Sequence, residues 1–255
     1  LEILESSALG DLETVSGIIK TCQEALGVNI ALDDFGTGYS SLTHLRNLTA
    51  NTIKIDQSFV RDVLDDPSDY AIIEGVIGLA NAFNREIIAE GVETTEHGLM
   101  LLIMGCVDAQ GYGIAKPMPA KDVSGWLSSY QPNKEWLLFA SKFRTVKENK
   151  LAFFQLITEH WINHFTANIT SPPERVTQWP NMNERDDHCG QWIKREKQGS
   201  LFDNEDLQNL EQAHEDFHLT AQSLQVKYQD GDIDSAREDL SELQTAFDKM
   251  NSALA

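Results

Sequence analysis

The chain has 255 residues, 41% of them apolar, which is enough to build a core in one large domain or two smaller ones. Forty acidic residues against 20 basic ones give a formal net charge of −20, so non-specific attraction to nucleic acid or anionic lipid is disfavoured and no nucleic-acid partner is expected. The three cysteines, Cys22, Cys106 and Cys189, are too few and too scattered to predict a disulfide framework.

The apolar residues and the cysteines indicate the cellular compartment in which the protein is expected. No stretch approaches the roughly 18 consecutive apolar residues of a transmembrane helix, and the start of the chain does not read as a signal peptide. Together with the scattered cysteines, this favours the cytoplasm. Because the chain begins with Leu1 rather than methionine, in what reads as a strand, we expect a piece of a longer polypeptide that can carry a membrane anchor upstream.

The first half of the chain alternates β-rich runs with amphipathic stretches. The β-rich runs cover residues 1–5, 28–33, 52–55 and 86–89. This alternation is typical of repeated βα units around a parallel sheet. Charged residues end the last three runs, and the strand C-termini of a (β/α) barrel are where active sites are built. We therefore predict an α/β domain over residues 1–130.

The second half of the chain reads as helical. After Pro132 the β-branched runs vanish, which places a domain boundary between residues 128 and 135. Residues 145–168, 203–229 and 232–254 have helical periodicity, with Asp203 as the expected N-cap of the second of these helices. An all-α four-helix bundle over residues 145–255 is the predicted second domain.

Carboxylates, a lysine and a glycine-rich loop stand at the predicted strand ends. Asp33 and Asp34 precede Phe-Gly-Thr-Gly, and Glu90 and Gln110 supply oxygens at later strand ends. Hard divalent cations prefer such oxygens, and Lys54 adds a cation that can hold a nucleophile or a phosphoryl oxygen. Together they indicate a two-metal hydrolytic site. A lone Asp-Asp pair can equally be a solvated cap, but four such features in successive units favour function.

The segments DDFGTGYSSL, TIKIDQSFV, IIAEGVET and AQGYGIAKPMP resemble consecutive signature segments of the EAL domain family. The resemblance runs through nearly all of residues 1–128. It implies that Asp33 and Asp34 bind Mg²⁺ or Mn²⁺, that Lys54 contacts the attacking water, and that Glu90 binds metal or acts as a base. It further implies supporting roles for Gln110, which orients a metal ligand or water, and for Glu2 and Glu93, which are further metal-binding acids.

By this resemblance, the domain is the C-terminal portion of a (β/α) barrel that hydrolyses cyclic di-GMP to the linear dinucleotide with two metals. The family's barrel begins well upstream, so part of its active site falls outside the chain. An open half-barrel exposes sheet edges and apolar surface. We therefore expect this chain alone to be inactive and to need an upstream portion or a homodimer partner. An upstream sensory or diguanylate-cyclase-like domain is also expected.

A second set of candidate ligands lies in the helical half. His214 and His218 are four residues apart on one apolar helix stripe, so both imidazoles can reach one metal. His160 and Cys189 are the further candidates, and a His₃Cys set suits Zn²⁺. Buried histidines that only satisfy hydrogen bonds are the alternative reading. His164 and His188 need not be ligands.

A helix histidine, then Cys-Gly-x-Trp, then HxxxH resembles the chemoreceptor zinc-binding (CZB) domain, a four-helix bundle that senses zinc and often dimerises. The resemblance covers residues 148–255. In the family's pattern the cysteine precedes the tryptophan by five residues, whereas Cys189 precedes Trp192 by three. Counting from Trp192 puts Asp187 at the ligand position, so the third ligand stays open between Cys189 and Asp187.

Two functions follow from these patterns. The leading hypothesis is a cyclic di-GMP phosphodiesterase whose activity or assembly is tuned by zinc at the helical domain. The alternative is a non-catalytic cyclic di-GMP receptor and zinc or redox sensor that acts through protein–protein interaction, because oxidation of a ligating sulfur would weaken the metal site.

Overall fold

The computed structural model describes residues 1–5, 12–37 and 50–254, except the side chains of residues 12 and 13. Residues 38–42 of the DDFGTGYSSL segment lie outside these described ranges. The chain forms two compact units. The first contains Leu1–Val63 and Ser68–Phe143, and the second contains Leu64–Pro67 and Arg144–Ala255.

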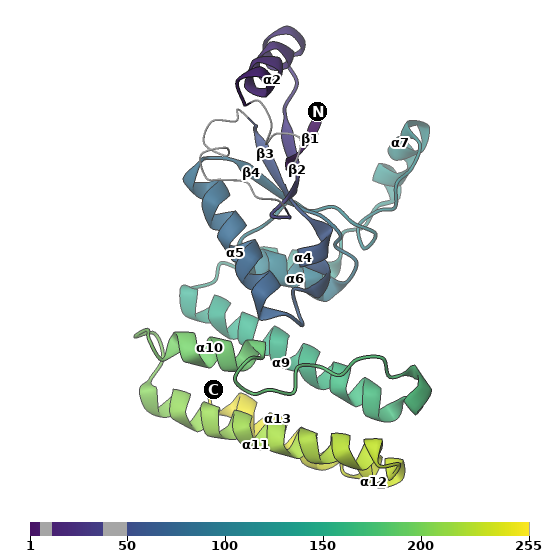
Figure 1. The fold of residues 1–255 in the computed structure, drawn as a ribbon, viewed down its shortest axis with the longest axis vertical. Coiled ribbons are helices and arrows are strands. Elements are labelled where there is room, and N and C mark those ends of the chain that lie inside the picture. The colour runs from purple at the N-terminus through teal and green to yellow at the C-terminus, as the bar shows by residue number, and fades with distance from the viewer. Residues whose placement is uncertain (6–11, 38–49, 255) are drawn as a thin grey trace. The chain divides into compact units, whose positions relative to one another are not determined.

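The first unit is built on four parallel strands in the order β1-β2-β3-β4 (Figure 1). Sequential parallel strands are what repeated βα units produce, so the predicted α/β character is confirmed. A further parallel bridge joins Ala89 to Ala109 beside β4. The strands are β1 (Glu2–Leu4), β2 (Ala31–Phe35), β3 (Thr52–Ile55) and β4 (Glu86–Ala89).

Helices alternate with these strands. They are α2 (Leu12–Leu26), α4 (Gln57–Asp62), α5 (Pro67–Ala82) and α6 (Thr95–Met104). All four residues of β3 are buried, and Ile53 and Ile55 lie in one core with Ile73 of α5 and Met100 of α6. The tripeptide Glu24-Ala25-Leu26 lies at the C-terminal end of α2.

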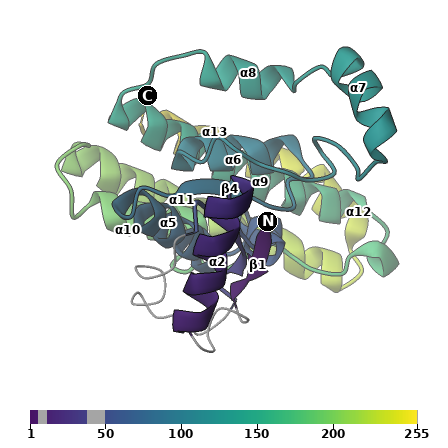
Figure 2. The same ribbon diagram turned by 90° about the horizontal axis from the view of Figure 1, so that it is seen from above.

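Two further helices belong to the first unit, α7 (Ala120–Ser129) and α8 (Lys134–Ala140), joined by a short connection (Figure 2). Trp136 of α8 packs onto α6, where its Nε1 donates to the carbonyl of Thr95 at 2.8 Å. Gly98 permits this approach, since a Cβ there would lie 2.3 Å from the Trp136 ring. The first unit thus extends to Phe143, beyond the predicted boundary between residues 128 and 135.

The second unit is helical. Its helices are α9 (Val146–Thr170), α10 (His188–Glu196), α11 (Asn204–Gln229), α12 (Ile233–Glu238) and α13 (Leu240–Ser252), with a 3₁₀ turn at Pro173–Arg175. Thr145 and Glu148 form a capping box at the start of α9, and Asp203 caps α11 as predicted. Phe154, Phe165 and Leu207 are among the residues fully buried between these helices.

The predicted helix over residues 232–254 is wrong as one element, because it divides into α12 and α13. Asp239 joins the two helices with a ψ of 2°, away from helical values. Its carboxylate accepts from Lys227 Nζ on α11 at 2.5 Å, which holds the break in place. Among the described residues, no helix is long and apolar enough to span a bilayer.

Candidate functional site

Two adjacent aspartates at the end of β2 serve one site because the strand is irregular there. The register with β3 shifts between Leu32 and Phe35, and Asp34 has a φ of 55°, in the left-handed region. Consecutive residues of a regular strand point to opposite faces, whereas a bulge re-aims one of them. Carboxylate oxygens of Asp33, Asp34 and Glu90 consequently lie within 4.8 Å of one another.

Lys54 of β3 supplies positive charge among these groups. Its side chain is 5% exposed, and its Nζ lies 2.5 Å from Glu90 Oε1, 2.8 Å from Asp33 Oδ1 and 2.9 Å from Glu2 Oε1. Burial lowers the pKa of Lys54, but hydrogen bonds to these carboxylates outweigh burial and raise the pKa above its ordinary value. Lys54 is therefore a fixed cation that joins residues from β1, β2 and the end of β4.

The carboxylates repel one another, which favours a bound cation. Burial raises the pKa of Asp34, and the neighbouring Asp33 and Asp56 raise it further. Burial also raises the pKa of Glu90, although Lys54 opposes that shift. A divalent cation among these oxygens would relieve the repulsion, and carboxylate donors suit Mg²⁺ or Mn²⁺. The donor set therefore fits the predicted metals.

Of the two remaining predicted residues of this site, the structure places Gln110 beside the carboxylates and Glu93 apart from them. Gln110 lies next to the group, because its Nε2 donates to Glu90 Oε1 at 2.8 Å. Glu93 is exposed, and it is not among the carboxylates that converge in the described part of the chain. Its backbone N–H donates to His97 Nδ1 at 3.5 Å. The geometry thus supports a role for Gln110 and gives no support to Glu93 as a ligand.

Glu5 was missed by the sequence analysis. It is 2% exposed, and its Oε2 accepts from the backbone N–H of Gly36 at 2.9 Å. Gly36 has a φ of 104°, in the left-handed region that glycine adopts readily. This bond ties the end of the β1 segment to the turn that follows Asp34. The available signal was a pair of acids, because Glu2 begins β1 and Glu5 directly follows its last residue.

A second group of donors lies inside the helical unit. Asp187 Oδ2 is 3.1 Å from Nε2 of His214 and 3.1 Å from Nε2 of His218, and the three side chains are at most 5% exposed. Two donors bound at about 2.0–2.1 Å to one tetrahedral ion lie about 3.3 Å apart, so these separations suit a single ion. Imidazole and carboxylate donors fit Zn²⁺.

Local structure orients each of these donors. His214 and His218 are one turn apart on the buried side of α11. Asp187 caps α10, with Oδ1 accepting from Gly190 N–H at 2.7 Å, so its Oδ2 faces the histidines. His218 Nδ1 is 3.3 Å from the carbonyl of Met182, a contact that favours a proton on Nδ1 and a metal on Nε2.

The charges in this group are coupled. Burial raises the pKa of Asp187, but hydrogen bonds from His214 and His218 outweigh it and lower the pKa to about 2. Burial lowers the pKa of His214, but Cys189 and Asp187 outweigh it and raise the pKa above its ordinary value. The group therefore pairs an ionised carboxylate with a protonated imidazole, and a metal ion would displace that proton.

Two predicted zinc ligands are not in this group. Cys189 is 3% exposed, and burial raises the pKa of its thiol although His214 opposes that shift; its sulfur is not among the donor atoms that converge with Asp187 in the described residues. His160 also lies outside this group: its Nε2 is 3.1 Å from Asp65 Oδ1, although its side chain lines the same small cavity as His214. Asp187, the alternative ligand found by counting back from Trp192, contacts both histidines of α11.

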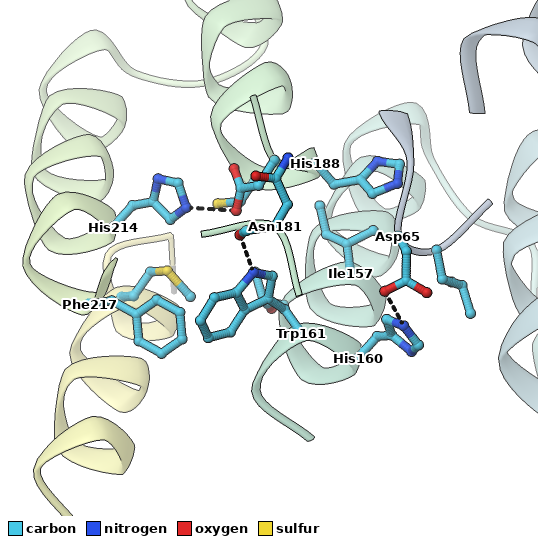
Figure 3. Close-up of a pocket in the computed structure, with 13 residues that line it drawn as sticks. Asp65, Ile157, His160, Trp161, Asn181, His188, His214 and Phe217 are labelled. Atoms are coloured by element: carbon cyan, nitrogen blue, oxygen red, sulfur yellow. Dashed lines mark hydrogen bonds and ion pairs between the residues drawn. The ribbon is translucent and has the colours of Figure 1, made fainter. Parts of the chain in front are cut away.

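A small cavity borders the donors of the helical unit. Its volume is about 20 Å³, which is room for one water molecule or one ion. Figure 3 shows His214 and His160 on opposite sides of Trp161, whose Nε1 donates to the carbonyl of Asn181. The lining includes Thr158, Asp187, Cys189 and His214.

Comparisons with known proteins relate the first unit to a family. Residues 1–117 match the model of the EAL domain. Over 127 residues the chain is 42% identical to cyclic di-GMP phosphodiesterase PA2567 of Pseudomonas aeruginosa, covering 50% of this chain and 22% of that protein. The chain thus spans about a fifth of the length of the curated relatives it matches.

Solved structures also contain segments similar to the first unit. The EAL domain of Mycobacterium smegmatis DcpA is 42% identical, covers 52% of this chain and 59% of that chain, and aligns with a TM-score of 0.48. A manganese and cyclic di-GMP complex of Klebsiella pneumoniae BlrP1 is 31% identical, covers 46% of this chain and 29% of that chain, and has a TM-score of 0.43. The sequence match assigns residues 1–117 to the EAL domain family.

Proposed function

We propose that the first unit carries part of the active site of a cyclic di-GMP phosphodiesterase. The observation that carries this proposal is the position of Lys54, whose Nζ lies 2.5–2.9 Å from the carboxylates of Glu2 in β1, Asp33 in β2 and Glu90 directly after β4. Relatives with this family's domain are named as cyclic di-GMP phosphodiesterases. A buried cation ringed by metal-binding acids is suited to phosphodiester hydrolysis.

Each residue has a proposed role. Asp33, Asp34 and Glu90 hold the divalent cations, which polarise the phosphate and make a water molecule more acidic when bound. Lys54 steadies the water or a phosphoryl oxygen, and Gln110 orients Glu90 through its hydrogen bond. Glu2, which contacts Lys54, is a further candidate ligand. Glu93 is a candidate from the family resemblance alone.

The 255-residue chain by itself is proposed to be inactive. Within the described residues β1 is an edge strand, and the side chain of Glu2 on it is 58% exposed. A site open to water on one side loses the exclusion that strengthens electrostatic catalysis. Incubation with cyclic di-GMP and Mn²⁺ is expected to give no linear product above a metal-only control. Turnover by this chain would contradict the proposal.

The openness at Glu2 also favours the alternative, a receptor that binds cyclic di-GMP without cleaving it. Isothermal titration paired with a turnover assay separates the two functions in the longest form of the protein. Binding and hydrolysis together support the phosphodiesterase. Binding without hydrolysis, with the metal sites loaded, supports the receptor.

For the helical unit, we propose that Asp187, His214 and His218 bind zinc, as in a CZB-like domain, and that zinc modulates the first unit, its dimerisation or both. Supporting this proposal, both histidine Nε2 atoms lie 3.1 Å from one oxygen of Asp187 in a buried setting. Turnover and oligomeric state, measured with and without zinc in the wild type and in Asp187→Ala, test the regulation. Equal responses in both proteins would contradict it.

A further inference from the structure

A third group of potential metal donors pairs two histidines of α9 with an aspartate. His160 Nε2 is 3.1 Å from Asp65 Oδ1, and His164 Nδ1 is 3.4 Å from the same oxygen. The three donor atoms lie within 4.8 Å of one another. Asp65 belongs to Leu64–Pro67, the short segment that clusters with the helical unit.

The helix itself creates the histidine pair. His160 and His164 are one turn apart on α9, so their rings project side by side, with centroids 6.2 Å apart. Trp161, the next residue, points into the core instead, where its ring lies 5.0 Å from that of His218. Figure 3 shows His160 and His214 on opposite sides of Trp161, and all three side chains line the same small cavity.

The spacing suits one metal ion. Donors at about 2.0–2.1 Å from a tetrahedral ion are about 3.3 Å apart, which lies between the 3.1 Å and 3.4 Å contacts to Asp65. The side chains of His160, His164 and Asp65 are 25%, 29% and 40% exposed, so water can complete the coordination. Two imidazoles and one carboxylate with open positions form a donor set for Zn²⁺, Ni²⁺ or Cu²⁺.

We propose that His160, His164 and Asp65 form a second transition-metal site, exposed and exchangeable, in addition to the buried group at Asp187. Hydrogen bonds from the two histidines outweigh burial and lower the pKa of Asp65, so its carboxylate is ionised. The exposed site exchanges metal quickly, whereas the buried group releases it slowly. The two sites therefore differ in rate as well as in position.

The test is zinc titration of the metal-free 255-residue chain, with bound metal quantified by mass spectrometry. With excess Mg²⁺ present to occupy the strand-end carboxylates, the wild type is expected to bind about two zinc ions, one removed rapidly by a chelator and one slowly. The double variant His160→Asn with His164→Asn is expected to lose only the rapidly exchanging ion. Glu159→Gln, an exposed substitution on the same helix, serves as the matched control and should retain both ions.

A wild-type stoichiometry of one that the double variant leaves unchanged would overturn the proposal. The variant Asp187→Asn shows which of the two sites holds a single bound ion. It should remove only the slowly exchanging ion, so its failure to do so would count against the buried site instead. Circular dichroism checks that each variant is folded. If the double variant is unfolded, Asp65→Asn and the single variant His164→Asn repeat the test.

Discussion

The strand-end site and the buried site of the helical unit both combine acidic and basic side chains, but in opposite proportions. At the strand ends a fixed lysine cation serves several carboxylates, one of them 58% exposed. In the helical unit one carboxylate serves two histidines, and all three are almost fully buried. The first arrangement leaves room for hard, exchangeable cations and substrate. The second suits one tightly held borderline ion.

The largest expected effect concerns the lysine. Lys54→Met should lower turnover roughly 10³-fold in the longest active form of the protein, because it removes the preorganised cation beside the phosphate. Steady-state hydrolysis of cyclic di-GMP measures the loss. Lys20→Met, which alters a side chain that is 70% exposed, is the control. Near-normal activity of Lys54→Met would remove the lysine from the proposed mechanism.

In the helical unit, Asp187→Ala should abolish the slowly exchanging zinc ion and destabilise the metal-free unit by roughly 3–5 kcal/mol, because it leaves buried histidine charge unpaired. Chemical denaturation and metal analysis give the two readouts. The adjacent Asp186 is exposed, so Asp186→Ala is the matched control. Equal stability and zinc content in both variants would show that Asp187 is not central to the group.

Gly190→Ala tests the geometry of the same group through the backbone. A Cβ at Gly190 would lie 2.0 Å from the carbonyl oxygen of Glu184, so the start of α10 must shift and the cap by Asp187 must weaken. We expect a loss of about 1–3 kcal/mol in stability and weaker zinc binding. Gly199→Ala, where the nearest atom would be 3.4 Å away, provides the comparison. Equal effects would argue against a tight approach at Gly190.

The coupled charges of Asp187 and His214 predict that zinc affinity and the stability of the helical unit depend on pH. Because the pKa of His214 is raised, zinc must displace a proton, so zinc affinity should rise by up to about tenfold per pH unit between about pH 6 and pH 8. In the absence of metal, the raised His214 pKa stabilises the fold most below pH 6.5, and this contribution fades as pH rises. Calorimetry in buffers of different ionisation enthalpy measures the released proton, and a pH-independent affinity would contradict the scheme.

The smallest expected effect distinguishes the two candidate third ligands. Cys189→Ala should keep the slowly exchanging zinc ion, because Asp187 supplies the donor that converges with the histidines. Stability should fall only modestly, by about 1 kcal/mol, for the lost sulfur packing. Loss of zinc in Cys189→Ala with retention in Asp187→Ala would reverse the assignment.

The sequence predicted the strands best where burial is continuous. Residues 52–55 and 86–89 coincide with β3 and β4, whereas β2 was expected at residues 28–33 and lies at Ala31–Phe35. The aspartates there read as a strand end, but a bulge with left-handed Asp34 continues the ladder to Phe35. A bulge has no simple sequence pattern, so the convergence of Asp33 and Asp34 required coordinates.

The helical site shows a different limit. The spacing of His214 and His218 predicted their shared face, because i and i+4 residues lie together on any helix. No such rule determines which side of α9 faces α11, so His160 was grouped with residues it does not contact. Counting from Trp192 kept Asp187 as an alternative, and it is this residue that contacts both histidines.

The difference between the two metal sites is tested most directly by anomalous diffraction from crystals grown with both Mn²⁺ and Zn²⁺, with data collected around each absorption edge. We expect manganese density among Asp33, Asp34 and Glu90 and zinc density among Asp187, His214 and His218. Absence of zinc among Asp187, His214 and His218, or manganese away from the strand ends, would contradict the account.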